Sequence, residues 1–413
     1  MIDYKEHILA NGLRVLVNED TTSAMAAVNL LYEVGSRDEE PHRTGFAHLF
    51  EHLMFRGTCG VPDFDEPVQE VCGENNAFTS ADYTNYYITT PKDNFRTALW
   101  LEADRMRGLD ITPEKLRVEK SVVVEEFNQR FLNRPYGEQW HTLRAMVYKE
   151  SPYRWPVIGL TPDHIRDASM EDVKAFYDRF YLPSNAILSV SAALSAEEVF
   201  EAAEHFFSEV PTLPAPATRS YPTESPITAP RRHTIEAAVP ADQITIAFLM
   251  GDRGSREYYI CDLLTDLLAG GESARIYQHL VRRRQIFSAA NAYITGERGQ
   301  GMLILTGQIN PGVSVEEAED ALYGELELLV REPVGDYELT KVQNKFEANI
   351  TFGELNVMNK AMNLGYYRML GDMTLLNGET AIYRSITAEE IAEFIRHNLG
   401  RNQSATLIYR SKP

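Results

Sequence analysis

The chain has 413 residues, of which 44% are hydrophobic. This length can bury a large core and predicts two or more domains. The formal net charge of −20 argues against a nucleic-acid scaffold, because proteins of that class need basic surfaces to meet phosphate.

Cysteine content and the first residues favour a cytoplasmic protein. The three cysteines, Cys59, Cys72 and Cys261, cannot form a paired disulfide framework and lack Cys-x-x-Cys spacing. A reducing compartment is the simplest explanation for this cysteine content. Residues 1–7 have the features of neither a signal peptide nor a transit segment, and no apolar run reaches the roughly 18 residues that span a bilayer. We therefore expect no partnership with membranes or nucleic acid.

The N-terminal residues predict two extended runs, at 7–17 and 26–34. The first contains the dipeptide Asn11-Gly12, which favours a tight hairpin turn. An apolar segment at 45–57 follows and predicts a helix.

That helix carries the motif His48-x-x-Glu51-His52. The two histidines are four residues apart, so they lie on one helical face with Glu51 beside them. Two imidazoles can bind zinc, and a catalytic zinc site adds a third protein ligand and leaves one position to water. Glu51 is the candidate general base for that water. The order of residues is the inverse of the commoner His-Glu-x-x-His.

Chance is the alternative, because ten histidines allow a five-residue pattern to occur without a function. A third ligand would decide between the two interpretations. The next segments are a β-rich polar stretch at 73–87 and helices at 92–108 and 113–131. The last of these begins after Thr112 as N-cap, with Pro113 at its first position.

This last helix supplies candidates for the third ligand. Glu119 and Glu126 are seven residues apart, so two helical turns place both on one face, beside the apolar Val122 and Val123. Either glutamate can reach a metal. A solvated acidic face is the alternative, and Glu125 fits it best.

A proline-rich segment at 211–232 predicts an extended linker between a domain at 1–210 and a second at 233–413. The halves are similar: residues 30–37 recur at 246–253, and the segments 170–176 and 186–190 recur at 388–394 and 405–409. Two copies of one domain are the economical explanation. The positions of His48 and His52 are taken by Leu264 and Leu268 in the second copy, so only the first can carry metal chemistry.

We therefore expect an α+β protein with two homologous α/β-sandwich domains, each a mixed or antiparallel sheet with helices packed on it.

The residues that carry a resemblance to a known family are His48-x-x-Glu51-His52, the glutamates at 119 and 126, and the run Asn76-Ala-Phe-Thr79. With these residues, the chain resembles the insulinase/pitrilysin family of zinc metallopeptidases. Its size is similar to that of the short members akin to mitochondrial processing peptidase. The segments at 153–159 and 176–185 also resemble family segments, so the likeness covers essentially the whole chain.

The resemblance implies that His48, His52 and Glu126 bind one zinc ion, that Glu51 activates the water, and that Glu119 supports a ligand histidine. It further implies that the substrate adds as an extra strand to an edge strand. The residues of that strand are Asn76, Ala77 and Phe78. From the residues alone, Asn76 and Thr79 can equally serve a turn.

One segment departs from the family. Active single-chain members carry an arginine and a tyrosine seven residues apart in the second half, which hold the substrate and the developing oxyanion. The resemblance places Val281 and Ser288 there, and neither can do this.

Three explanations remain for this departure. In the first, nearby residues supply the pair after a local shift (Arg282, Arg283 or Arg284 with Tyr293), although such an arginine cluster also fits a solvated helix end. In the second, the chain is a weak or inactive relative. In the third, a homologous second subunit provides the arginine and tyrosine. We favour the third explanation.

The sequence thus predicts a zinc endopeptidase subunit that hydrolyses short or unfolded peptides by metal-activated water, within a heterodimer or otherwise a homodimer. The alternative is a non-catalytic core or assembly subunit of the same fold. A peptide-binding module with structural zinc fits less well, because two histidines and one glutamate leave a coordination position open.

Overall fold

The computed structural model describes residues 1–58, 60–212 and 219–412. The chain forms two compact units, each with a mixed sheet and packed helices, which confirms the predicted α+β class. Unit 1 comprises Met1–Phe127, Trp155–Tyr221 and Ile350–Gly378. Unit 2 comprises Asn128–Arg154, Pro222–Asn349 and Glu379–Pro413.

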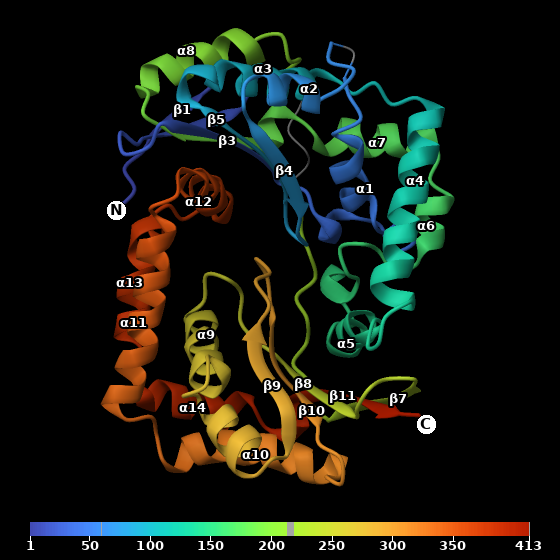
Figure 1. Ribbon diagram of the computed structural model, residues 1–413, viewed down its shortest axis with the longest axis vertical. Coiled ribbons are helices and arrows are strands. Elements are labelled where there is room, and N and C mark those ends of the chain that lie inside the picture. The colour runs from blue at the N-terminus through green and yellow to red at the C-terminus, as the bar shows by residue number, and fades with distance from the viewer. Residues whose placement is uncertain (59, 213–218, 413) are drawn as a thin grey trace. The chain divides into compact units, whose positions relative to one another are not determined.

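Unit 1 is built on a six-stranded sheet with the order β1-β2-β6-β3-β5-β4. Figure 1 labels its strands β1, β3, β4 and β5. Strands β2 and β6 are parallel and the other neighbours are antiparallel. The predicted hairpin at Asn11-Gly12 is confirmed, and Gly12 adopts φ +92° between β1 and β2. The strands are β1 (Lys5–Ile8), β2 (Arg14–Glu19), β3 (Met25–Tyr32), β4 (Glu74–Thr79), β5 (Thr84–Pro91) and β6 (Ala186–Ala192).

Helices cover both faces of this sheet. Strand β3 is buried on each side: Val28 and Leu30 join the main core, whereas Ala27 and Leu31 face α12. This explains why β3 is almost entirely apolar, since a strand buried on both faces has no solvated side. The helices of unit 1 are α1 (Phe46–Leu53), α2 (Asp65–Glu70), α3 (Phe95–Arg107), α4 (Pro113–Phe127), α6 (Pro162–Arg166), α7 (Met170–Phe180), α8 (Ala196–Phe207) and α12 (Val357–Leu370).

Unit 2 has a five-stranded sheet with the order β7-β11-β8-β10-β9. Strands β7 and β11 are parallel, as β2 and β6 are. The order therefore matches β2-β6-β3-β5-β4 strand for strand, which confirms the predicted repeat. The strands are β7 (Arg231–Ala237), β8 (Gln243–Leu249), β9 (Phe287–Ile294), β10 (Met302–Ile309) and β11 (Ser404–Ser411), and the helices are α5 (Gln139–Val147), α9 (Arg256–Ala269), α10 (Val315–Arg331) and α14 (Ala388–Asn398).

The two units do not follow the contiguous ranges 1–210 and 233–413. Residues 128–154 belong to unit 2 and 350–378 to unit 1, so α11 (Asp336–Gly353) and α13 (Leu375–Ser385) each run from one unit into the other. Helix α12 packs against β3 and β6 because its small Ala361 and Gly365 allow close approach: the Ser189 hydroxyl donates to the Ala361 carbonyl at 2.7 Å. Helix α5 packs against β8 and β11.

The predicted linker at 211–232 lies partly outside the described residues, because it includes 213–218. Strand β7 begins at Arg231, before the predicted end of the linker. Cys72 is an exposed free thiol and Cys261 a buried one, while Cys59 lies outside the described residues. Among the described helices, none combines the length and the apolar character that crossing a lipid bilayer requires.

Candidate metal centre

Helix α1 carries the two histidines, and its start is fixed by its surroundings. Gly45 precedes the helix with φ +92°, and a Cβ atom there would lie 2.7 Å from the Ile158 carbonyl oxygen. The buried carboxylate of Glu39 accepts hydrogen bonds from the backbone N–H groups of Gly45 (2.8 Å) and Ala47 (2.9 Å). These bonds satisfy donors that a helix start leaves without intrahelical partners. These contacts fix the residue at which α1 begins, and therefore the face of the helix on which His48 lies.

Helix α4 brings the glutamates. The predicted N-cap is confirmed, because the Thr112 hydroxyl accepts from the Lys115 backbone N–H at 3.2 Å. Glu119 lies on the buried face of this helix with 1% of its side chain exposed, and Glu126 is partly buried at 19%.

The prediction that Val122 lies on the apolar side is wrong. Val122 is 41% exposed, whereas Val123 is buried. Consecutive helical residues point about 100° apart, and the buried face of α4 follows Leu116, Glu119 and Val123, so Val122 lies beyond its edge. Glu125 is exposed, as expected for a solvated position.

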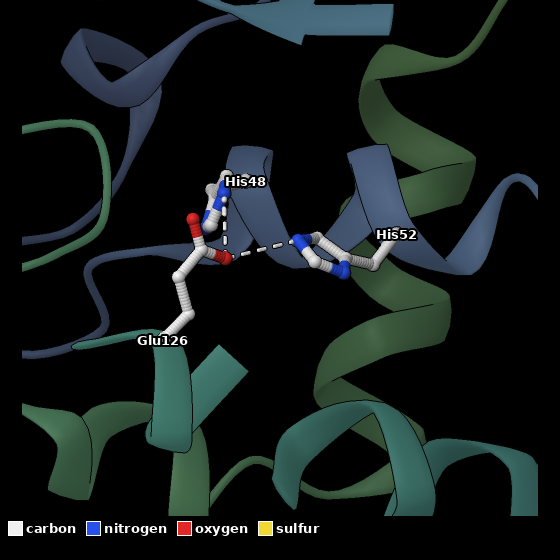
Figure 2. Close-up of side chains that lie close together, drawn as sticks. All are labelled: His48, His52 and Glu126. Atoms are coloured by element: carbon white, nitrogen blue, oxygen red, sulfur yellow. Dashed lines mark ion pairs between the residues drawn. The ribbon is translucent and has the colours of Figure 1, made fainter. Parts of the chain in front are cut away.

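The two helices bring His48, His52 and Glu126 together. One carboxylate oxygen, Oε2 of Glu126, lies 3.6 Å from Nε2 of His48 and 3.4 Å from Nε2 of His52 (Figure 2). One ligand atom from each of the three residues lies within 4.8 Å of the others. In the described part of the chain this is the one such group of three or more metal-binding side chains.

This donor set fits a zinc ion. Two atoms bound at about 2.0–2.1 Å to one tetrahedral ion lie about 3.3–3.4 Å from each other. The measured separations of 3.4 and 3.6 Å are close to that value. Two imidazoles and one carboxylate also leave the fourth position open, as in catalytic rather than structural zinc sites.

A second layer of charged groups surrounds His52. Oε2 of Glu119 lies 3.6 Å from Nδ1 of His52, the ring nitrogen that does not face Glu126. Arg56, four residues after His52 and beyond the end of α1, holds the other oxygen of Glu119 at 2.5 Å. Burial lowers the pKa of His52, but hydrogen bonds to Glu119 and Glu126 outweigh it and raise that pKa to about 9. In the metal-free chain at neutral pH, His52 is therefore protonated.

Glu51 is partly buried and lies next to His52 in α1. Its Oε2 accepts a hydrogen bond of 2.6 Å from the Thr79 hydroxyl, which comes from the end of β4. Strand β4 is the edge of its sheet and pairs with β5 alone among the described strands. Asn76, Ala77 and Phe78 all lie within this strand, so Asn76 does not serve a turn.

Arg56 was not identified from the sequence as a partner of Glu119, and the contact between Thr79 and Glu51 was not predicted. The predicted helix at 45–57 would have placed Arg56 on the face of His52, but α1 ends at Leu53 and Arg56 lies beyond it. No local signal existed for Thr79, since its contact depends on how the β4–β5 hairpin folds over α1.

Val281 and Ser288, the two residues that differ from the family's arginine and tyrosine, lie on separate elements of unit 2. Val281 lies in the π-helix η6 (Tyr277–Arg283), and Ser288 is exposed on β9, the strand that also carries Tyr293. Arg282, Arg283 and Arg284 are exposed at the end of η6. Leu264 and Leu268 of α9 are buried in the core.

Comparison with known proteins gives matches along most of the chain. Residues 14–146 match the family model described as Insulinase (Peptidase family M16), and residues 167–346 match the model described as Peptidase M16 inactive domain.

Two curated relatives show the range of similarity. A protein of Helicobacter pylori named zinc protease PqqE is 28% identical over 340 residues, covering 81% of this chain and 76% of its own length. A probable mitochondrial-processing peptidase subunit beta of Arabidopsis thaliana is 25% identical over 58% of this chain and 45% of its own length.

Among solved structures, a protease from Helicobacter pylori has a TM-score of 0.94 at 25% identity and covers 99% of this chain and 100% of its own. These relatives support a peptidase-type function.

Proposed function

Because the chain belongs to the insulinase family, peptidase family M16, we propose that it is a zinc endopeptidase subunit that hydrolyses short or unfolded peptides. The observation that carries the proposal is the convergence of His48, His52 and Glu126 within 4.8 Å, with Glu51 beside them on α1. This set combines three ligands, an open position and a base.

The ligands would hold one zinc ion per chain. When bound, zinc supplies Lewis acidity that polarises a peptide carbonyl and acidifies water. Glu51 takes the proton from the attacking water and then delivers it to the leaving amine, as a general base and acid in turn. Glu119, itself held by Arg56, orients His52 through the nitrogen that faces away from the metal position.

The substrate would bind to β4 as an additional strand. An edge strand offers unpaired backbone N–H and C=O groups, and a peptide in extended form can pair with them. Asn76, Ala77 and Phe78 lie along this edge. Because main-chain bonds do not depend on side chains, this mode of binding tolerates many sequences but requires an extended, and therefore unfolded, substrate.

We further propose that a homologous second subunit completes the site. Val281 has no charge and Ser288 no phenol, so neither can hold a substrate carbonyl in the way that an arginine and tyrosine pair does. A partner that contributes this pair would make a heterodimer the active form. Cleavage assays with the chain alone and with a homologous chain added test this directly, and full activity of the chain alone would contradict it.

The alternative is a non-catalytic core subunit of the same fold, which the description of the model for residues 167–346 as an inactive domain keeps open. Metal analysis separates the two. A catalytic subunit purifies with, or takes up, zinc in a near-stoichiometric amount, and a core subunit does not.

Glu51→Gln tests the mechanism. The amide keeps the size of the side chain but cannot accept the proton, so peptide cleavage should fall by at least about 100-fold. Zinc content, measured by elemental analysis, should not change, because Glu51 is not a ligand. Wild-type cleavage by the variant would refute the proposed mechanism.

A further inference from the structure

Thr79 makes a direct contact with the proposed base. Its hydroxyl donates to Oε2 of Glu51 at 2.6 Å, which is short for a hydrogen bond and typical of a charged acceptor. The donor comes from β4 and the acceptor from α1. The contact therefore joins the strand proposed to receive the peptide to the residue proposed to activate water.

The position of Thr79 is fixed by the hairpin in which it lies. Thr79 is the last residue of β4 and pairs with Thr84 of β5. The turn between them is closed by Ser80, whose hydroxyl accepts from the backbone N–H groups of Asp82 (3.1 Å) and Tyr83 (3.0 Å). A turn with these bonds leaves the Thr79 side chain little freedom to move away from Glu51.

The same hairpin is anchored to the loop that sets the start of α1. Arg37 pairs with Asp82 at 2.6 Å, with both side chains buried, and its backbone N–H donates to the Ala81 carbonyl. Gly35 fits closely here, because a Cβ atom would lie 2.5 Å from Ala81. Two residues beyond Arg37 is Glu39, which binds the first N–H groups of α1. One loop thus holds both the hairpin and the helix.

We propose that Thr79 is a positioning residue for Glu51. Its hydroxyl holds Oε2 and leaves Oε1 to accept the proton of the attacking water. This inference rests on the proposed function and adds to it: the strand that binds the substrate also aims the base. A displacement of β4 would carry the Thr79 hydroxyl with it, so substrate pairing on β4 and base orientation are mechanically linked.

A role in orientation predicts a specific kinetic signature. Thr79→Val removes the hydroxyl but keeps the shape, so kcat should fall by about 10- to 100-fold, the usual cost of losing a supporting contact in such sites. KM should not change, because the substrate loses no contact. Thr79→Ser should restore most of kcat, since it restores the donor. Zinc content should be equal in all variants.

The control is Thr89→Val, on the neighbouring strand. Thr89 pairs with Glu74 at the opposite end of the β4–β5 ladder, so the same chemical change there should leave kcat unaltered. All variants are compared in the assembly in which the wild-type chain cleaves peptide.

A measurement without catalysis tests the same contact. In a double-mutant cycle of Thr79→Val and Glu51→Ala, the changes in unfolding free energy should be non-additive, because each removes one partner of one bond. Additive changes would overturn the inference, as would a normal kcat in Thr79→Val, a rise in KM alone, or a failure of serine to rescue. Wild-type cleavage by Glu51→Gln would instead refute the proposed function.

Discussion

Replacement of Glu119 by glutamine should weaken zinc binding without removing a ligand. Glu119 is 1% exposed and serves two cationic or N–H groups at once, Arg56 at 2.5 Å and His52 at 3.6 Å. A carboxamide has one acceptor oxygen, so it can satisfy only one of them and presents an NH₂ donor to the other. Arg56 is half exposed and can turn to water, but even an amide oxygen that keeps facing His52 is a neutral acceptor and supports the imidazole less strongly than a carboxylate does.

The expected loss follows from this geometry. A ligand histidine without its supporting carboxylate typically loses about 10- to 100-fold in metal affinity, which corresponds to about 1.4–2.7 kcal/mol. A second effect opposes the loss at neutral pH. Glu119 also raises the pKa of His52, so His52 of the variant releases its proton to solvent more easily when the metal binds.

The assay must separate these effects. Competitive titration with a zinc chelator at about pH 9.5, where most of His52 is neutral in either protein, reduces the difference in protonation and emphasises the supporting contact. Glu125→Gln is the matched control, because it removes the same charge from an exposed position of the same helix. Equal affinities for Glu119→Gln and the control at this pH would refute the role of Glu119.

Two further predictions concern pH. With the pKa of His52 near 9 in the metal-free chain, zinc must displace a proton, so affinity should rise about tenfold per pH unit between about pH 6 and 8; chelator titration measures this, and a flat profile contradicts it. In unit 2, Asp262 accepts from the Tyr383 hydroxyl at 2.6 Å, and burial raises its pKa from 3.8 to about 6. The folded chain then binds this proton more tightly than the unfolded chain, so the stability gained below about pH 4 is lost as pH rises to about 6. The wild-type chain should therefore lose about 1–3 kcal/mol of unfolding free energy relative to Asp262→Asn between pH 4 and pH 8. Denaturant titrations of both proteins at the two pH values measure this change. A difference that does not vary with pH would count against this.

Local pattern was enough to predict the elements that carry the site. The spacing of His48 and His52 placed both on one helical face, and a separation of seven residues placed Glu119 and Glu126 together on one face of the next helix. These two placements succeeded because helical periodicity alone decides them, whereas the choice of Glu126 as the third ligand rested on the family resemblance. The width of the buried face of α4 was overestimated by one residue, so Val122 was wrongly predicted to lie on it.

The remaining features depend on contacts between distant segments. Thr79 reaches Glu51 only because the β4–β5 hairpin is held against the loop before α1, and no local pattern encodes that. The assignment of residues 350–378 to unit 1 was missed for the same reason: the place of α12 on β3 and β6 depends on close fit at Ala361 and Gly365, which no local pattern shows.

That exchange of helical segments determines what happens when the chain is divided into fragments. Each half of the sequence provides the helix that covers the other half's sheet, α5 in one direction and α12 in the other. A fragment that ends in the proline-rich segment would therefore leave the apolar face of β3 and β6 open to solvent. The face of β8 and β11 that α5 covers would be open in the complementary fragment for the same reason. Both halves of the sequence are therefore needed to cover either sheet in the way the intact chain does.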